Sequence, residues 1–134
     1  VLDGVIALAE KHHVTGFIST NLAKSRVNDR IIDTEVPERG GMSGLVVQKL
    51  SDEQIAYIYR KTKGKFVIIG CGGVFTAEDA YRKIRLGANL IQMITGMIFE
   101  GPQVVGEINR GLVKLLKRDG FKNISEAVGI DTRG

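Results

Sequence analysis

Three short apolar runs alternate along this chain with segments of helical periodicity, and this alternation limits the possible folds more than any other feature. The apolar runs lie at residues 16–20, 66–70 and 90–94. Amphipathic segments lie at residues 3–13, 51–63, 76–86 and 102–119, with a short helical turn at 125–128. Buried apolar strands joined by helical crossovers are parallel. The sequence therefore predicts the α/β class, with three parallel strands.

Capping and terminating residues mark the ends of these helices. Ser51 and Gln54 have the spacing of a capping box, which predicts that a helix begins at Ser51. Thr76 is expected to cap the next helix, and Gly87 to end it. Pro102 suits the first turn of a further helix. The apolar stripe of that helix is predicted to comprise Val105, Ile108, Leu112, Leu115 and Leu116.

The segment from residue 22 to residue 50 interrupts the alternation. It holds many charges and the run Gly40-Gly41-Met42-Ser43-Gly44, without a sustained hydrophobic period. A loop of this length is usually functional or disordered. We expect it to cover a site, with residues 40–44 approaching the ligand and residues 26–39 mobile. Its acidic residues are expected to form a solvated face, made of Asp29, Asp33, Glu35 and Glu38.

The length of the chain indicates part of a larger domain. Its 134 residues are about half of the roughly 250 in a complete (β/α)8 barrel. Three strands cannot close a barrel, and the chain opens at Val1 on a helix that no strand precedes. We therefore interpret residues 1–134 as the later part of something larger, a fragment or a processed half, with no second domain within them.

Composition excludes several other classes of protein. The hydrophobic fraction of 43% rules out a disordered chain, and no apolar run approaches the roughly 20 residues that cross a bilayer. The single cysteine, Cys71, excludes an intrachain disulfide and disfavours a zinc site, so we expect no metal and a reducing cytoplasm. The net charge of +4 is spread among acidic residues and tryptophan is absent, which disfavours nucleic-acid binding.

Glycine-rich turns follow two of the predicted strands. Gly70-Cys71-Gly72-Gly73 follows one strand and Thr95-Gly96 the next. Because the carboxyl ends of parallel strands share one edge of the sheet, these turns are expected to be neighbours. Exposed amides at two such turns favour a phosphate site, and simple tight turns are the alternative interpretation. The glycine spacing does not match the dinucleotide fingerprint, which disfavours a Rossmann NAD site.

Side chains with possible chemical roles are few. Ser19-Thr20-Asn21 ends the first strand with donors and acceptors that suit the amide-like edges of a planar heteroaromatic ring, and turn chemistry is the alternative. His12 and His13 are expected to be exposed at a helix end. Cys71 is expected to be a small buried residue, because the sequence places no base beside it.

Ordered motifs extend over nearly the whole chain. They are Ile18-Ser19-Thr20-Asn21, Gly40-Gly41-Met42-Ser43-Gly44, Ile68-Ile69-Gly70-Cys71-Gly72-Gly73-Val74, Asp79-Ala80, Lys83-Ile84, Gly87-Ala88, Gln92, Thr95-Gly96 and Gly101-Pro102. Together they resemble the carboxyl-terminal half of dihydroorotate dehydrogenase. The later segments Gly120-Phe121 and Glu126-Ala127-Val128-Gly129 resemble in particular its quinone-linked, membrane-associated class.

This resemblance implies the last three strands of an FMN-dependent (β/α)8 TIM barrel that oxidises dihydroorotate to orotate in pyrimidine biosynthesis. The residues that it places at the flavin are Thr20, Gly44, Gly72, Gly73, Ile94, Thr95 and Gly96. Asn21 and Leu22 would face the pyrimidine. The family usually has threonine at the position of Leu22 and tyrosine at that of Ile94. Leu22 therefore lacks the hydroxyl group, and a flavin contact at Ile94 would be made by its backbone.

The resemblance also implies parts of the enzyme beyond this segment. The serine base, the flavin-binding lysine and the quinone-binding helices are expected before Val1. The enzyme is expected to lie peripherally on the cytoplasmic side of a membrane, with this segment itself soluble. We expect the isolated chain to be inactive, because half of the site is missing, and to associate through its open sheet edges.

Two alternatives are compatible with the sequence. Another FMN- or phosphate-binding barrel, such as a dihydrouridine synthase or a sugar-phosphate isomerase, would share the two glycine turns but would not need Asn21 or the 40–44 run. A non-catalytic half-barrel, paired with itself or with a complementary half, would account for the missing strands.

Overall fold

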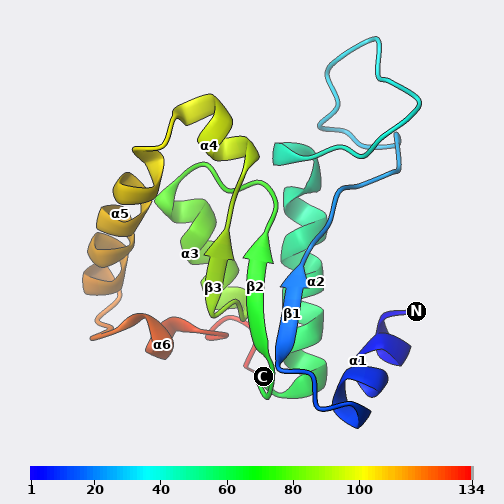
Figure 1. Cartoon of the computed structure of the whole chain (residues 1–134). Coiled ribbons are helices and arrows are strands. Elements are labelled where there is room, and N and C mark those ends of the chain that lie inside the picture. The colour runs from blue at the N-terminus through cyan, green and yellow to red at the C-terminus, as the bar shows by residue number, and fades with distance from the viewer. Residues whose placement is uncertain (134) are drawn as a thin grey trace.

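The computed structural model describes residues 1–133, in which helices alternate with a parallel three-stranded sheet (Figure 1). The elements are α1 (Leu2–Lys11), β1 (Gly16–Ser19), the 3-10 helix η1 (Gly44–Val47), α2 (Gln48–Thr62), β2 (Val67–Cys71), α3 (Ala77–Leu86), β3 (Leu90–Gln92), α4 (Thr95–Glu100), α5 (Val104–Arg118) and α6 (Ile124–Ala127). The strands lie in the order β1-β2-β3, and both pairings are parallel. The predicted α/β class and the three parallel strands are confirmed.

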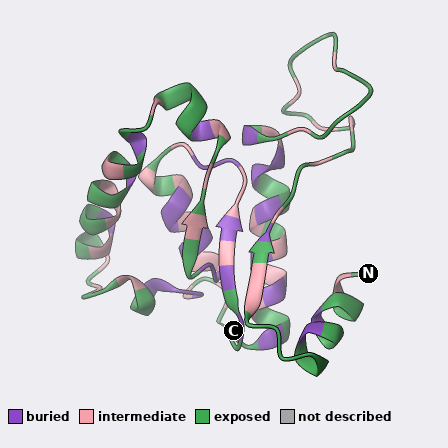
Figure 2. Ribbon diagram, in the orientation of Figure 1, coloured by how far each residue is buried: buried purple, intermediate pink, exposed green. Residues whose placement is uncertain are grey.

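Helices cover only one face of the sheet. Phe17, Ile68 and Ile91 pack toward α2 and α3, in a core that also contains Ile55. On the opposite face, Ile18 and Leu90 are 63% and 58% exposed, although both are strand residues (Figure 2). Within residues 1–133, no element lies over this apolar face. An apolar inner face of this kind is what a barrel buries against its other strands.

A second layer of helices lies beyond α3. Helix α5 packs on α3 through Leu115, which joins Tyr81 and Ile84 in one apolar cluster with the end of α6. Polar contacts attach the tail after α6 to α3. The carboxylate of Asp131 pairs with the Arg85 guanidinium, and the Thr132 hydroxyl donates to the carbonyl of Leu86.

The predicted ends of α3 are confirmed, whereas the predicted start of α2 is wrong. The Thr76 side chain accepts a hydrogen bond from the amide of Asp79, whose side chain accepts one from the Thr76 amide; Gly87 ends the helix at φ +134°. Helix α2, however, begins at Gln48, directly after η1, and Ser51 lies fully buried inside it. The Ser51 hydroxyl contacts the neighbouring strand instead of capping its own helix.

The segment after β3 also differs from the prediction. The strand ends at Gln92, and Thr95-Gly96 is the first turn of the helix α4, not an isolated turn. Helix α5 starts two residues after Pro102, and its stripe is shifted, because Val104 is buried while Val105 is exposed. Ile108 and Leu115 are buried as expected.

The excursion between β1 and η1 is irregular and held together by polar contacts. Regular structure resumes at Gly44, so the excursion is shorter than the predicted 22–50. An antiparallel bridge joins Ala23 to Met42 near its two ends. The Arg26 guanidinium donates across the loop to the carbonyls of Pro37 and Gly40. The predicted solvated acidic face is confirmed, since Asp29, Asp33, Glu35 and Glu38 are all exposed.

Candidate functional site

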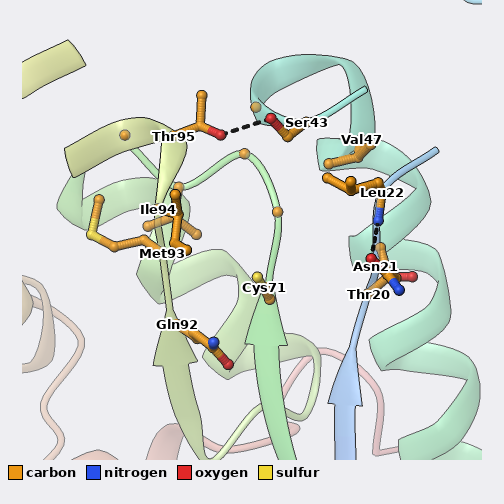
Figure 3. A pocket seen from close by; sticks show the side chains of 15 residues that line it. Thr20, Asn21, Leu22, Ser43, Val47, Cys71, Gln92, Met93, Ile94 and Thr95 are labelled. Atoms are coloured by element: carbon orange, nitrogen blue, oxygen red, sulfur yellow. Dashed lines mark hydrogen bonds between the residues drawn. The ribbon is translucent and has the colours of Figure 1, made fainter. Parts of the chain in front are cut away.

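A cavity of about 200 Å³ lies at the carboxyl ends of the three strands (Figure 3). All nine residues that the sequence predicted for a ligand site line it: Thr20, Asn21, Leu22, Gly44, Gly72, Gly73, Ile94, Thr95 and Gly96. The sequence analysis missed six further lining residues: Ser43, Val47, Cys71, Val74, Gln92 and Met93. Neighbourhood in the chain could have found all of them except Val47, because each of the others is next to a predicted residue or ends a strand; Val47 ends η1, three residues after Gly44.

The turn after β2 requires glycine at two positions. Gly72 and Gly73 have φ values of +112° and +69°, which side chains rarely allow. A Cβ atom at Gly73 would lie 2.4 Å from the Cβ of Gln48, and one at Gly72 would lie 2.9 Å from Val47. Because glycine has no side chain, Gly72 leaves room for Val47 of η1, and Gly73 leaves room for Gln48 of α2. Gly70 is a residue of β2, as the predicted apolar run 66–70 implies, and Cys71 is the last residue of this strand.

Two carbonyls of this turn, those of Cys71 and Gly73, accept hydrogen bonds, while its amides at residues 72–74 are free. The carbonyl of Cys71 accepts from the Thr20 amide at 3.0 Å and from the Ser51 hydroxyl at 2.6 Å. The carbonyl of Gly73 accepts from Gln48 Nε2 at 2.6 Å. The consecutive amides of residues 72–74 donate to no atom of residues 1–133. Unpaired backbone amides in succession are suited to an anion.

Residues from three segments meet around this turn. The Thr95 hydroxyl donates to Ser43 Oγ at 2.9 Å, which links the end of β3 to the end of the excursion (Figure 3). A Cβ atom at Gly96 would lie 2.1 Å from the carbonyl oxygen of Val74, so α4 starts directly against the glycine turn. Gly44, at φ +78°, faces the Thr95 methyl group. The expectation that the two turns are neighbours is confirmed.

Asn21 is fixed by a local hydrogen bond beside the cavity. Its Oδ1 accepts from the amide of Leu22 at 2.7 Å, which is turn chemistry, as the alternative interpretation proposed. Its Nδ2 has no partner within residues 1–133 and remains a donor. The Leu22 and Ile94 side chains, 53% and 61% exposed, add apolar surface at the cavity.

Cys71 is the one titratable residue among the fifteen that line the cavity. Its side chain is partly exposed, which corrects the expectation of a fully buried residue. Burial raises the pKa of the thiol, although the nearby Lys83 ammonium opposes this shift, so the thiol stays protonated at neutral pH. His12 and His13 are exposed at the end of α1, as predicted. The lining residues can thus bind and orient a ligand.

Lys83 is a buried charge that the sequence analysis did not assign to the site. Its side chain is fully buried behind β2, and Nζ donates to Ser51 Oγ at 2.8 Å and to Asp52 Oδ1 at 2.7 Å. Burial lowers the pKa of the ammonium, although the Asp52 carboxylate opposes the shift. The sequence signal for this position was its place on the buried face of α3, one turn after Ala80.

The sheet, its single covered face and the cavity at the strand ends match part of a (β/α)8 barrel. The sequence profile of the dihydroorotate dehydrogenase family matches residues 2–116, and the chain belongs to this family. The earlier resemblance is thereby confirmed. The family match also decides against a dihydrouridine synthase or a sugar-phosphate isomerase.

Similar proteins are found among both sequences and solved structures. The chain is 43% identical over 132 residues to a mitochondrial dihydroorotate dehydrogenase (quinone) of Arabidopsis thaliana, covering 98% of this chain and 29% of the relative. It is 45% identical over 136 residues to a dihydroorotate dehydrogenase (quinone) of Synechocystis, and this alignment covers 97% of this chain and 36% of the relative. Crystal structures of the Eimeria tenella dihydroorotate dehydrogenase, with ferulenol and ligand-free, superpose with TM-scores of 0.90 and 0.87 at 32% and 30% identity. Each alignment covers 97% of this chain, and the two alignments cover 34% and 36% of the Eimeria tenella chains, respectively.

The chain thus spans about a third of the length of the relatives that it matches. The barrel assignment is confirmed by these structures, with which this chain aligns over about a third of their length. None of the helices in residues 1–133 is long and apolar enough to cross a membrane. No group of three or more potential metal-ligating side chains is found in the same residues.

Proposed function

We propose that the chain contributes to the FMN-dependent oxidation of dihydroorotate to orotate in pyrimidine biosynthesis, by holding the FMN phosphate and part of the substrate pocket. In this proposal, residues 1–134 are the carboxyl-terminal part of the FMN-binding barrel domain. The observation that carries it is the run of three free amides at residues 72–74, with Thr95 and Gly96 against them. Family membership supports the flavin assignment.

The cavity residues fit an FMN phosphate by the chemistry of their donors. Backbone amides bind a phosphate without a neighbouring cation, and the hydrogen-bonded hydroxyl pair of Thr95 and Ser43 keeps one hydrogen as a side-chain donor. The flavin, when bound, accepts a hydride from the substrate. Thr20 and Gly44 would contact the same cofactor from β1 and from η1. Ile94 would contribute through its backbone, because its side chain offers no hydrogen bond.

Asn21 and Leu22 would form one side of the substrate pocket. With Oδ1 of Asn21 held by the Leu22 amide, its free Nδ2 is oriented as a donor. A pyrimidine carbonyl oxygen is an acceptor that suits this donor. Leu22 would provide only apolar contact. The pair therefore orients the ring, and the proton acceptor and the quinone contact are assigned to other parts of the enzyme.

The relationship to quinone-linked enzymes supports a proposal about location. Quinones dissolve in membranes, so an enzyme that reduces them is expected to lie peripherally on a membrane, here on its cytoplasmic side. The relatives named dihydroorotate dehydrogenase (quinone) support quinone as the electron acceptor.

A second proposal, that the chain by itself is a non-catalytic half-barrel that self-associates, is favoured by its uncovered sheet face. Ile18, Ile69 and Leu90 form one row across the three strands, and the outer two are exposed. Such surfaces are rarely left open to water. In this state the sheet would pair with another copy of the chain or with a complementary half-barrel.

Anaerobic flavin reduction tests the proposed enzymatic function. The protein at its full natural length is loaded with FMN and mixed with dihydroorotate, and the loss of the oxidised-flavin absorbance is recorded. We expect stoichiometric reduction with formation of orotate. Reduction no faster than that of free FMN would refute the proposal. Succinate, which offers no pyrimidine ring, serves as the control substrate.

A further inference from the structure

Two side chains of α2 anchor the glycine turn from behind. Gln48 and Ser51 are one helical turn apart, and both are buried. Ser51 donates to the carbonyl of Cys71, and Gln48 donates to the carbonyl of Gly73. The two anchored carbonyls belong to alternate residues of the same turn.

Each anchoring side chain is itself held by a cation. Lys83 Nζ donates to Ser51 Oγ at 2.8 Å, and Arg30 Nη1 donates to Gln48 Oε1 at 2.7 Å. Ammonium and guanidinium groups are donors only. Ser51 must therefore accept from Lys83, which leaves its single hydrogen for Cys71. In the same way Arg30 fixes Oε1 of Gln48, so that Nε2 donates to the carbonyl of Gly73 and, with its second hydrogen, to Asp79 Oδ1 at 2.9 Å.

The free amides lie on the other side of the same peptide groups. The carbonyl of Cys71 and the amide of Gly72 belong to one peptide, as do the carbonyl of Gly73 and the amide of Val74. In a trans peptide these two groups point in opposite directions. A carbonyl that accepts a hydrogen bond makes its own amide a stronger donor, by about 10–30% per bond. Anchoring the carbonyls to α2 thus turns the two amides away from α2 and polarises them.

We propose that Lys83–Ser51 and Arg30–Gln48 are two hydrogen-bond relays that position and polarise the amides of Gly72 and Val74 for an anionic group. The inference rests on the proposed function, in which this anion is the FMN phosphate. The four side chains are positioning residues, because they act through the turn. The Lys83 relay is the stronger one, since Lys83 is fully buried while Arg30 is exposed to water and salt.

Comparing FMN with riboflavin isolates the effect on the phosphate. Both ligands carry the same ring system, and only FMN carries the phosphate. Dissociation constants are measured by fluorescence titration of the flavin-free protein at its full natural length. Ser51→Ala is expected to weaken FMN binding by about three- to tenfold and to leave riboflavin binding within about twofold of the parent.

Matched controls separate the relay from general effects of the substitution. Thr62→Val also removes a buried hydroxyl from α2, but the Thr62 hydroxyl bonds only to Ile58 of its own helix. Gln48→Met tests the second relay if Ser51→Ala does not fold. Its control is Gln54→Met, because Gln54 contacts Ser19 and not the turn. Both controls should change the FMN and riboflavin constants by the same small factor.

A double-mutant cycle tests the link between Lys83 and Ser51. In Lys83→Met, Asp52 keeps its ion pair with Arg82 at 2.8 Å, so no carboxylate is left unpaired. Lys83→Met is expected to reduce the preference for FMN over riboflavin by about as much as Ser51→Ala does. The double variant should lose no more of this preference than either single variant. Additive losses in the cycle would refute the relay.

The remaining outcomes distinguish this inference from the function on which it rests. If the parent prefers FMN over riboflavin but Ser51→Ala and Gln48→Met keep that preference, the relays are refuted and the phosphate site stands. If the parent binds both ligands equally, the phosphate site itself is refuted, and the relays with it.

Discussion

Substitution of Gly73 by alanine is expected to damage both the turn and FMN binding. A side chain at φ +69° costs about 1–2 kcal/mol in backbone strain. The added Cβ would also lie 2.4 Å from the Cβ of Gln48 and 2.9 Å from its Cα, and overpacking of this kind costs about 1–3 kcal/mol. The free energy of unfolding should therefore fall by about 2–5 kcal/mol. The added bulk would face Gln48 of α2.

FMN binding should fall because relief of this clash moves the turn away from Gln48. The carbonyl of Gly73 would then lose its hydrogen bond, and the three free amides would no longer converge. We expect FMN affinity to fall at least about tenfold, equivalent to about 1.4 kcal/mol, measured by flavin titration beside urea unfolding. Gly120→Ala is the control, since Gly120 also has a positive φ of +78° but has no atom within 4 Å of its Cβ position. If Gly73→Ala matches this control in both stability and FMN affinity, the phosphate lies elsewhere.

Four further predictions follow from the site and its surroundings. Thr95→Ala should weaken FMN binding by about three- to tenfold at most, because it removes one hydrogen bond among several; a larger loss in titration would assign Thr95 a greater role. Gly44→Val should reduce FMN stoichiometry after gel filtration, since its Cβ would lie 3.0 Å from the Thr95 methyl; full retention of flavin would contradict this. The isolated 134-residue chain should form oligomers in light scattering and show no dihydroorotate-dependent flavin reduction, whereas an active monomer would refute both statements. Hydrogen bonds from Arg118 and Tyr81 lower the pKa of Asp119 from 3.8 to about 2, so stability should decrease as pH falls through this interval; Asp119→Asn should flatten that part of the pH–stability curve.

The sequence predicted which residues line one cavity, because the geometry of parallel strands is restrictive. Once three apolar runs were assigned to one parallel sheet, the residues following each run had to meet at one edge. Asn21, Gly73 and Thr95, which are far apart in the chain, line one cavity for this reason. The start of α3 could also be predicted from the sequence, because the side chain of Thr76 bonds to Asp79, only three residues further along the chain.

The predictions failed where a tertiary partner replaced the local one. Ser51 has the sequence context of a helix cap, but its hydroxyl bonds to β2 and the helix begins three residues earlier. Helix α4 was missed because its six residues include the exposed Ile98 and Phe99, which give no helical hydrophobic pattern. The burial of Lys83 depends on Asp52, thirty-one residues away in the chain.

The position of Lys83 explains how the proposed phosphate site can lack a cation among its lining residues. Gly70 makes room for the lysine stem, since a Cβ at this glycine would lie 3.3 Å from Lys83 Cδ. The ammonium therefore reaches α2 behind the strand, where Asp52 offsets the cost of its burial during folding. A cation in the cavity would have to shed water each time a ligand bound, whereas Lys83 is already dehydrated. The glycine at residue 70, a β-strand position without contact to the cavity, thus serves the site by admitting the charge that orders Ser51.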